Sequence, residues 1–174
     1  YFCFVNIGGE RSTVNGVVYT GLQAIKKDRE ITEAFQGILT DDKAEQIMES
    51  YERNKSFYKD GGITVTGGEP LLQLDFLLDL FTLAKQEGVH TCIDTSGIPF
   101  APSDKEWMEK LNRLLSMTDL VMLDIKHIDP KLHKQLTGHS NETILRFAHY
   151  LDRRKIPVWI RHVVVPTVTD DETF

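Results

Sequence analysis

From about residue 41 onward, the pattern of apolar and polar residues alternates between that of strands and that of amphipathic helices. Short apolar runs typical of strands alternate with stretches that have the 3.6-residue period of amphipathic helices. The expected strands are residues 63–66, 89–94, 120–125 and 158–165. The expected helices are residues 41–58, 74–87, 103–117, 130–137 and 142–154, with Ser103 as the cap of the third.

This alternation predicts right-handed βαβ units and a parallel sheet, that is, an α/β fold. A whole or partial (β/α) barrel and an open doubly wound sheet both satisfy the pattern, although four strands do not close the usual eight-stranded barrel. Residues 1–40 have weak periodicity and several glycines. We therefore expect an irregular segment at residues 1–40 and a single partial-barrel domain at residues 41–174.

Composition and charge narrow the classes of function. The 174 residues are 41% hydrophobic and 26% charged, which is ordinary for a globular domain. The formal net charge of −6 argues against non-specific binding to nucleic acid, which requires a basic field. No apolar run reaches the ~18 residues of a membrane helix, and no stretch has the pattern of a signal peptide.

The chain contains two cysteines, Cys3 and Cys92. Two thiols make no disulfide scaffold and favour a reducing compartment, so we expect a cytoplasmic protein. They also cannot hold an iron–sulfur cluster by themselves. Cys92 lies in an expected buried strand and is interpreted as inert core. Because the chain starts at Tyr1 and stops after an acidic run, we expect a fragment that lacks both ends.

Ionisable or backbone-exposing residues stand at the end of each expected strand. Since the carboxyl ends of parallel strands share one edge of a sheet, these residues are expected to form one site. Carboxylates match cationic groups, and lysine and arginine match a carboxylate, so the edge suits a small zwitterion. The residues are Gly67, Gly68 and Glu69, then Asp94 and Thr95, then Asp124 and Lys126, and finally Arg161.

Each of these residues also has a purely structural interpretation. Gly67 and Gly68 could simply make a tight turn. Glu69 could stabilise the first turn of a helix, and Asp94 could cap the turn that follows it. Asp124 could pair with Lys126 or with Arg161 inside the fold. His162 lies on the other face of its strand from Arg161, so we assign it a structural role.

Four segments, taken in order, resemble one family. They are residues 61–73 (GGITVTGGEPLLQ), 90–97 (HTCIDTSG), 118–126 (TDLVMLDIK) and 158–166 (VWIRHVVVP). In sequence and spacing they resemble the radical S-adenosylmethionine (SAM) enzymes that activate glycyl radical enzymes, closest to the pyruvate formate-lyase activating enzymes. The resemblance covers about residues 56 to 171.

The resemblance implies a partial (β/α)₆ barrel with a [4Fe-4S] cluster and SAM at its mouth. It also implies oxidoreductase activity that forms a glycyl radical on a partner such as pyruvate formate-lyase, with a flavodoxin or ferredoxin-like electron donor. The family holds its cluster with three cysteines spaced C-x3-C-x2-C, and Cys3 resembles the third of them. Phe4 stands where the family has a histidine, and the stretch up to Gly61 matches poorly. With one candidate thiolate, we expect the fragment itself to be inactive.

The resemblance also implies roles for individual residues. The Gly-Gly-Glu turn contacts the SAM amino group, and the residues of the last two strands line the methionine and ribose parts of SAM. The implied SAM-binding residues are Gly67, Gly68, Glu69, Asp124, Lys126, Arg161 and Val163. A monovalent cation beside the SAM carboxylate is implied at Asp94, Thr95 and Met122.

Other classes of protein remain open. Lys126 could form an imine in an aldolase- or isomerase-type barrel, although Asp124 nearby favours its charged form. A non-catalytic module could bind only a protein partner. Activators of other glycyl radical enzymes share the chemistry, but residues 158–166 and the lack of a cysteine-rich insert favour the pyruvate formate-lyase type.

Overall fold

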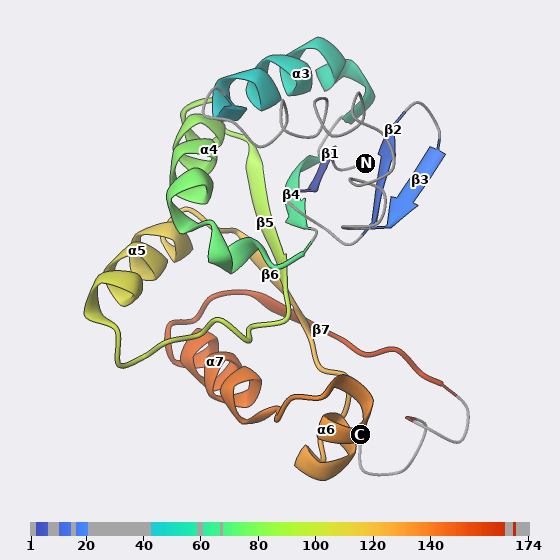
Figure 1. Ribbon diagram of the computed structural model, residues 1–174. Helices are drawn as coiled ribbons and strands as arrows, with labels where there is room; N and C mark the ends of the chain where they lie inside the picture. The colour runs from blue at the N-terminus through green and yellow to red at the C-terminus, as the bar shows by residue number, and fades with distance from the viewer. Residues whose placement is uncertain are drawn as a thin grey trace.

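The computed structural model describes residues 3–6, 11–14, 17–20, 43–58, 61–66, 68–165 and 169. At its centre lies a five-stranded sheet with the order β1-β4-β5-β6-β7 (Figure 1). Each pairing within this sheet is parallel. The strands are β1 (Cys3–Asn6), β4 (Gly62–Thr66), β5 (His90–Thr95), β6 (Leu120–Asp124) and β7 (Val158–Arg161).

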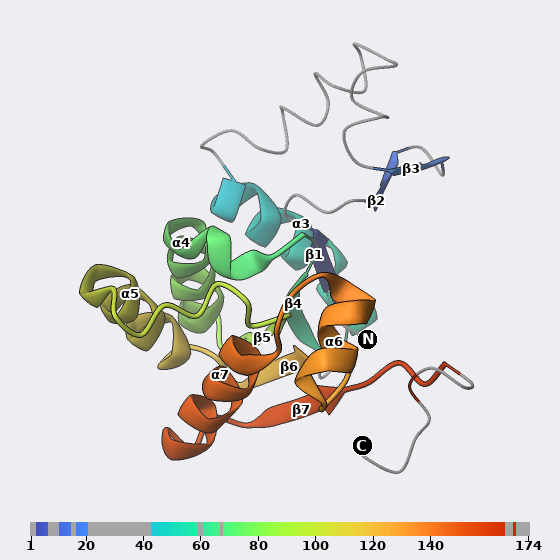
Figure 2. The same cartoon turned by 60° about the horizontal axis from the view of Figure 1, so that its bottom comes forward.

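The sequential order from β4 to β7 distinguishes a partial barrel from an open doubly wound sheet, the two arrangements that fit the sequence. In a doubly wound sheet the strand order reverses part-way, whereas here each strand lies beside its successor. Right-handed crossovers between such strands place the connecting helices on one face. Figure 2 shows α4, α5 and α7 along the outside of the curved sheet. The prediction of a partial parallel barrel is confirmed.

The helices lie close to their predicted positions. They are α3 (Lys43–Tyr58), α4 (Leu74–Gln86), α5 (Lys105–Leu115), α6 (Pro130–Thr137) and α7 (Glu142–Arg153), with a short 3₁₀ turn at Pro70–Leu72. No helix in the described ranges is both long and apolar enough to cross a membrane.

Two predicted boundaries were wrong. The cap of α5 is Asp104, not Ser103, because Asp104 has the extended backbone of a cap and its carboxylate accepts from Trp107 N at 3.0 Å. Strand β7 ends at Arg161, where its partner β6 also ends. The residues after Arg161 bond Thr169 in place of a strand, since the Thr169 hydroxyl accepts from Val165 N and donates to Val163 O, both at 2.7 Å.

Part of the fold lies before residue 40, where we expected irregular structure. Strand β1 extends the sheet beyond β4, and β2 (Arg11–Val14) pairs antiparallel with β3 (Val17–Thr20). The sheet therefore takes strands from both sides of the expected boundary at residue 40. The division into two parts stays a prediction.

The core lies between the sheet and the outer helices. Strand residues such as Ile63, Ile93 and Leu123 are fully buried against helix residues such as Phe81 and Phe147. Burying a side chain of this size stabilises the fold by about 1.5–3 kcal/mol. This packing fixes the strands relative to one another, and so it fixes the residues at their carboxyl ends.

Candidate active site

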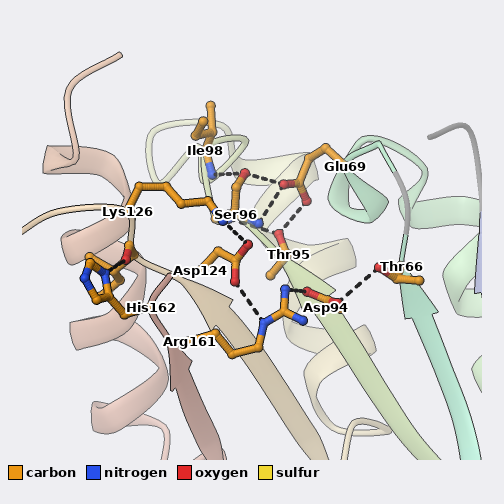
Figure 3. Close-up of polar contacts among 12 residues, drawn as sticks. Thr66, Glu69, Asp94, Thr95, Ser96, Ile98, Asp124, Lys126, Arg161 and His162 are labelled. Carbon is orange, nitrogen blue, oxygen red and sulfur yellow. Dashed lines mark hydrogen bonds and ion pairs between the residues drawn. The ribbon is translucent and has the colours of Figure 1, made fainter. Parts of the chain in front are cut away.

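The carboxyl ends of four neighbouring strands bring polar side chains together (Figure 3). Thr66 ends β4, Asp94 lies one residue before the end of β5, Asp124 ends β6 and Arg161 ends β7. The strand register pairs Asp124 directly with Arg161. The predicted meeting of Asp94, Asp124 and Arg161 at one edge is therefore what the structure shows.

Arg161 lies between two carboxylates. Its Nη2 donates to Asp94 Oδ1 at 2.5 Å and its Nε donates to Asp124 Oδ1 at 2.8 Å. The second oxygen of Asp94 accepts from Thr66 Oγ1 at 3.1 Å, and that of Asp124 accepts from Lys126 Nζ at 2.7 Å. Two cations and two anions thus alternate along one chain of ion pairs, from Asp94 to Arg161 to Asp124 to Lys126.

The two carboxylates are more enclosed than the two cations. The side chains of Asp94 and Asp124 are 11% and 21% exposed, whereas those of Arg161 and Lys126 are 42% and 41% exposed. Burial raises the pKa of Asp94 above its ordinary value, although the charge of Arg161 and the hydroxyl of Thr66 act in the opposite direction. An incoming carboxylate can therefore reach the cations from solvent while the aspartates stay in place.

Both carboxylate oxygens of Glu69 accept hydrogen bonds from other residues of the protein. Its Oε1 accepts from Leu71 N at 3.1 Å and from the hydroxyl of Thr95. Its Oε2 accepts from Ser96 N at 2.9 Å and from the hydroxyl of Ser96. Four donors occupy the roughly four acceptor positions of a carboxylate. The side chain therefore holds the turn after β4 against the end of β5, and a ligand at this turn is left with backbone groups.

Gly68 belongs to the same turn and explains why a glycine is needed there. It is exposed, and its φ of +42° lies in the left-handed region that residues with a Cβ rarely adopt. Exposed backbone beside the strand ends can hydrogen-bond an ammonium group through carbonyl oxygens. Gly67 lies outside the described residues.

The predicted ligands of the monovalent cation, Asp94, Thr95 and Met122, lie at the same edge. The side chain of Thr95, however, is already hydrogen-bonded within the protein. Its hydroxyl donates to Glu69 and accepts from Gly97 N at 2.9 Å. Met122 is paired with Asp94 in the sheet. The predicted ligand Val163 is exposed and follows the end of β7.

His162 lies between two backbone carbonyls, in agreement with a structural role. Its Nδ1 is 2.9 Å from Ile125 O, and its Nε2 is 2.9 Å from Thr169 O. These contacts join the end of β6 to the segment that follows β7. The ring is thereby held away from the Asp94–Arg161–Asp124 group.

The structure does not bring Cys3 to this edge. Cys3 begins β1 and is paired with Ile63, whereas Asn6 is paired with Thr66 at the carboxyl end. Its assignment as a cluster ligand stays a prediction. Cys92 is 1% exposed, and burial raises the pKa of its thiol to about 11.

Thr66 and Ser96 belong to the site, but no role was assigned to them from the sequence. Thr66 bonds Asp94, and Ser96 bonds Glu69 through both its backbone and its hydroxyl. The available signal was a hydroxyl residue directly after or at a strand end, next to residues already singled out. That signal is weak because threonine and serine are common at such positions.

The sequence matches the family model of the Radical SAM superfamily over residues 1–173. The chain belongs to the Radical SAM superfamily. It is 50% identical over 137 residues to the pyruvate formate-lyase-activating enzyme of Listeria monocytogenes, a match that covers 78% of this chain and 55% of that protein. The enzyme of the same name from Streptococcus mutans is 52% identical over 132 residues, covering 75% and 50%. The chain thus spans about half the length of the curated relatives it matches.

A solved structure agrees with this membership. A domain of the pyruvate-formate lyase-activating enzyme from Bacteroides vulgatus superposes with a TM-score of 0.54 at 30% identity, covering 64% of this chain and 65% of that one. The partial parallel barrel seen in the strand order is thereby supported by a protein of known structure.

Membership of the Radical SAM superfamily implies a [4Fe-4S] cluster and SAM. The strand-end residues fit SAM, because two partly exposed cations match its carboxylate and an exposed glycine turn can meet its amino group. The residues of this chain do not fit the cluster, which needs three thiolates where the chain has two cysteines. The described part of the chain also holds no group of three or more His, Cys, Asp or Glu residues that could bind a metal ion.

Proposed function

We propose that this chain is the central part of a radical SAM activating enzyme that forms a glycyl radical on a partner of the pyruvate formate-lyase type. The observation that supports this most is the Asp94–Arg161–Asp124–Lys126 group at the carboxyl edge of a radical SAM sheet. The identity of 50% or more to activating enzymes favours this partner class over other glycyl radical enzymes. A flavodoxin or ferredoxin-like protein would supply the electron.

The residues of this chain would bind and orient SAM. In enzymes of this kind the reductive cleavage of SAM supplies the radical that takes a hydrogen atom from glycine. Arg161 and Lys126 would turn from their aspartate partners toward the SAM carboxylate, since both side chains are open to solvent on one side. The backbone at Gly68, held in position by the side chain of Glu69, would meet the SAM amino group.

A monovalent cation fits the same proposal. Movement of Arg161 toward the ligand would leave the Asp94 and Asp124 carboxylates facing each other, and a cation would offset their repulsion. Oxygen atoms are the ligands that hard cations prefer. The site would then comprise Asp94, the backbone of Thr95 and Met122, and Asp124.

The compartment follows from the chemistry of the proposed reaction. An oxygen-sensitive cluster and a low-potential electron donor both require reducing conditions, which the cytoplasm provides. We therefore place the proposed activity in the cytoplasm.

An aldolase- or isomerase-type reaction is less well supported. Imine formation requires a neutral amine in a desolvated pocket. Lys126 instead forms an ion pair with Asp124 at 2.7 Å, and its side chain is 41% exposed.

Binding of SAM is the first test. Isothermal titration calorimetry should detect SAM binding to the chain, and Arg161→Ala should weaken it by about tenfold to hundredfold, the cost of one charged hydrogen bond. Lys134→Ala, which removes an exposed cation from α6, is the matched control and should bind as the parent does. If Arg161→Ala binds SAM as tightly as the control, the assignment of the site is wrong.

Activity is tested in a chimera. The matching 137-residue segment of the Listeria monocytogenes enzyme is replaced by the corresponding segment of this chain. After anaerobic reconstitution, the chimera should cleave SAM to 5′-deoxyadenosine and give a glycyl radical signal on pyruvate formate-lyase by electron paramagnetic resonance. The chain alone should show no [4Fe-4S] absorption, because it has two cysteines. A folded chimera that binds a cluster and SAM but forms no glycyl radical would contradict the proposed function.

A further inference from the structure

A groove lies between α5 and α7, outside the row of strand-end residues. The loop from β5 to α5 runs past α7 at this point (Figure 1). The groove has a volume of about 420 Å³. Its lining consists of Phe100 and Pro102 from the loop, Met108 from α5, and Arg146, His149, Tyr150 and Arg153 from α7.

The floor of the groove is preformed. The ring of Phe100 is buried, and its centroid lies 5.2 Å from that of Phe147 and 5.3 Å from that of Tyr150. The Tyr150 hydroxyl donates to Asn112 Oδ1 and so joins α7 to α5. Packed rings and this bond hold the two walls at a fixed separation, and a surface that needs no rearrangement loses less entropy on binding.

Three basic side chains form one stripe along the groove. Arg146, His149 and Arg153 have the i, i+3, i+7 spacing of a single helix face and are exposed. The opposite face of α7, with Phe147 and Leu151, is buried against the core. The stripe therefore points outward, beside the apolar floor.

Neither arginine of the stripe has an ion-pair partner among the described residues. The nearby carboxylates with ion pairs use other cations, since Glu106 pairs with Lys110 and Asp152 pairs with Lys155. At the strand-end site, by contrast, Arg161 has two carboxylate partners. An acidic protein of formal net charge −6 thus presents, at the edge of one groove, two guanidinium groups that form no ion pair with any residue that the structure describes.

The spacing of the arginines limits what can bind both. Seven helical residues separate Arg146 and Arg153, a rise of about 10 Å. This distance exceeds the size of a single phosphate or carboxylate. It matches two carboxylates that lie two turns apart on a helix or about three residues apart on a strand. The apolar floor between the arginines would receive a side chain from the same segment.

We infer that the α5–α7 groove is a docking surface for an acidic segment of a protein partner, with two carboxylates on either side of an apolar side chain. Guanidinium groups pair with carboxylates through two parallel hydrogen bonds, and these two have no ion pair with another described residue to break on binding. The surface is independent of the proposed reaction, because none of its residues belongs to the strand-end site.

The test uses a fluorescein-labelled helical peptide that places two glutamates two turns apart with a leucine between them. Fluorescence anisotropy measures its binding to the full chain. We expect binding that weakens with rising ionic strength and falls by about tenfold or more in Arg146→Glu/Arg153→Glu. The control Lys131→Glu/Lys134→Glu changes the net charge equally on exposed residues of α6 and should bind as the parent does. Circular dichroism checks that both variants are folded.

Three results would overturn the inference. The first is no binding of the peptide at low ionic strength. The second is an equal loss of binding in the two double variants, which would show a general charge effect. The third is equal binding of a peptide whose leucine is replaced by glycine, together with full competition by inorganic phosphate, which would show a site for small anions only.

Discussion

Arg161 Nη2 donates to Asp94 Oδ1 at 2.5 Å, although the two residues are 67 positions apart in the sequence. They lie on β7 and β5, with β6 between them. The long side chain of Arg161 reaches across this middle strand and also bonds Asp124 on it. One side chain therefore ties three strand ends together, and its removal affects both carboxylates at once.

This relationship predicts a pH-dependent loss of stability in Arg161→Ala. The pKa of Asp94 is already raised in the folded protein by burial, so the folded state binds its proton more tightly than the unfolded state. Stability from this group is then greatest below the ordinary value of 3.8 and falls as the pH rises through the raised pKa. Without Arg161 the pKa of Asp94 rises further, so the loss should extend to higher pH.

Urea denaturation between acidic and neutral pH measures this effect. Arg161→Ala should lose more stability than the parent as the pH rises. The extra loss should shrink in Asp94→Asn/Arg161→Ala, because an amide does not titrate. If Arg161→Ala causes the same pH-dependent loss of stability with Asp94 present and with Asp94→Asn, then Asp94 is not the source of that loss.

Glu69 is predicted to act through the turn that it holds. Glu69→Gln replaces one accepting oxygen with an NH₂ group, which cannot accept from Ser96. The turn at Gly68 should loosen, and affinity for SAM should fall by about tenfold, the effect of one lost hydrogen bond. Calorimetry measures the affinity, and amide hydrogen exchange at Gly68 to Leu72 measures the loosening. A weaker affinity with unchanged exchange would point instead to direct contact between Glu69 and the ligand.

Cys92 is predicted to be unreactive in the folded protein. Burial raises the pKa of its thiol to about 11, so almost no thiolate is present at neutral pH. Iodoacetamide should label Cys92 only after denaturation, as read by mass spectrometry. Cys92→Ala should keep the fold and SAM binding, at a cost in stability of about 1 kcal/mol for the lost packing. Rapid labelling of Cys92 in the native protein would show that its strand opens readily.

The cap of α5 can be tested by comparing a substitution of Asp104 with the same substitution of its neighbour Ser103. Asp104→Ala removes the acceptor of Trp107 N and should lower the free energy of unfolding by about 1 kcal/mol. Ser103→Ala should change it little, since Ser103 is exposed and precedes the cap. Chemical denaturation of both variants provides the measurement. The reverse order of effects would restore Ser103 as the cap.

From residue 41 onward, local sequence patterns were enough to predict the helices and strands to within a few residues, but they missed β1, β2 and β3. Local periodicity gives the strand or helix and its apolar face, because side chains repeat with the geometry of their own backbone. The positions of β4, β5 and β6 follow from this, as does the meeting of Asp94, Asp124 and Arg161 at the carboxyl edge. The order of four motifs also carried the family, which no single motif would have done.

Tertiary structure alone decided which residues pair. The sequence offered Asp124 a choice of Lys126 or Arg161, and the structure gives it both while Arg161 also takes Asp94. It also shows that the carboxylate of Glu69 accepts four hydrogen bonds within the protein, while its contact with SAM stays a prediction. The α5–α7 groove had no signal in the sequence. The bonds of Arg161 to Asp94 and Asp124 join residues that are 67 and 37 positions apart. They depend on strand order and side-chain reach, which local patterns do not encode.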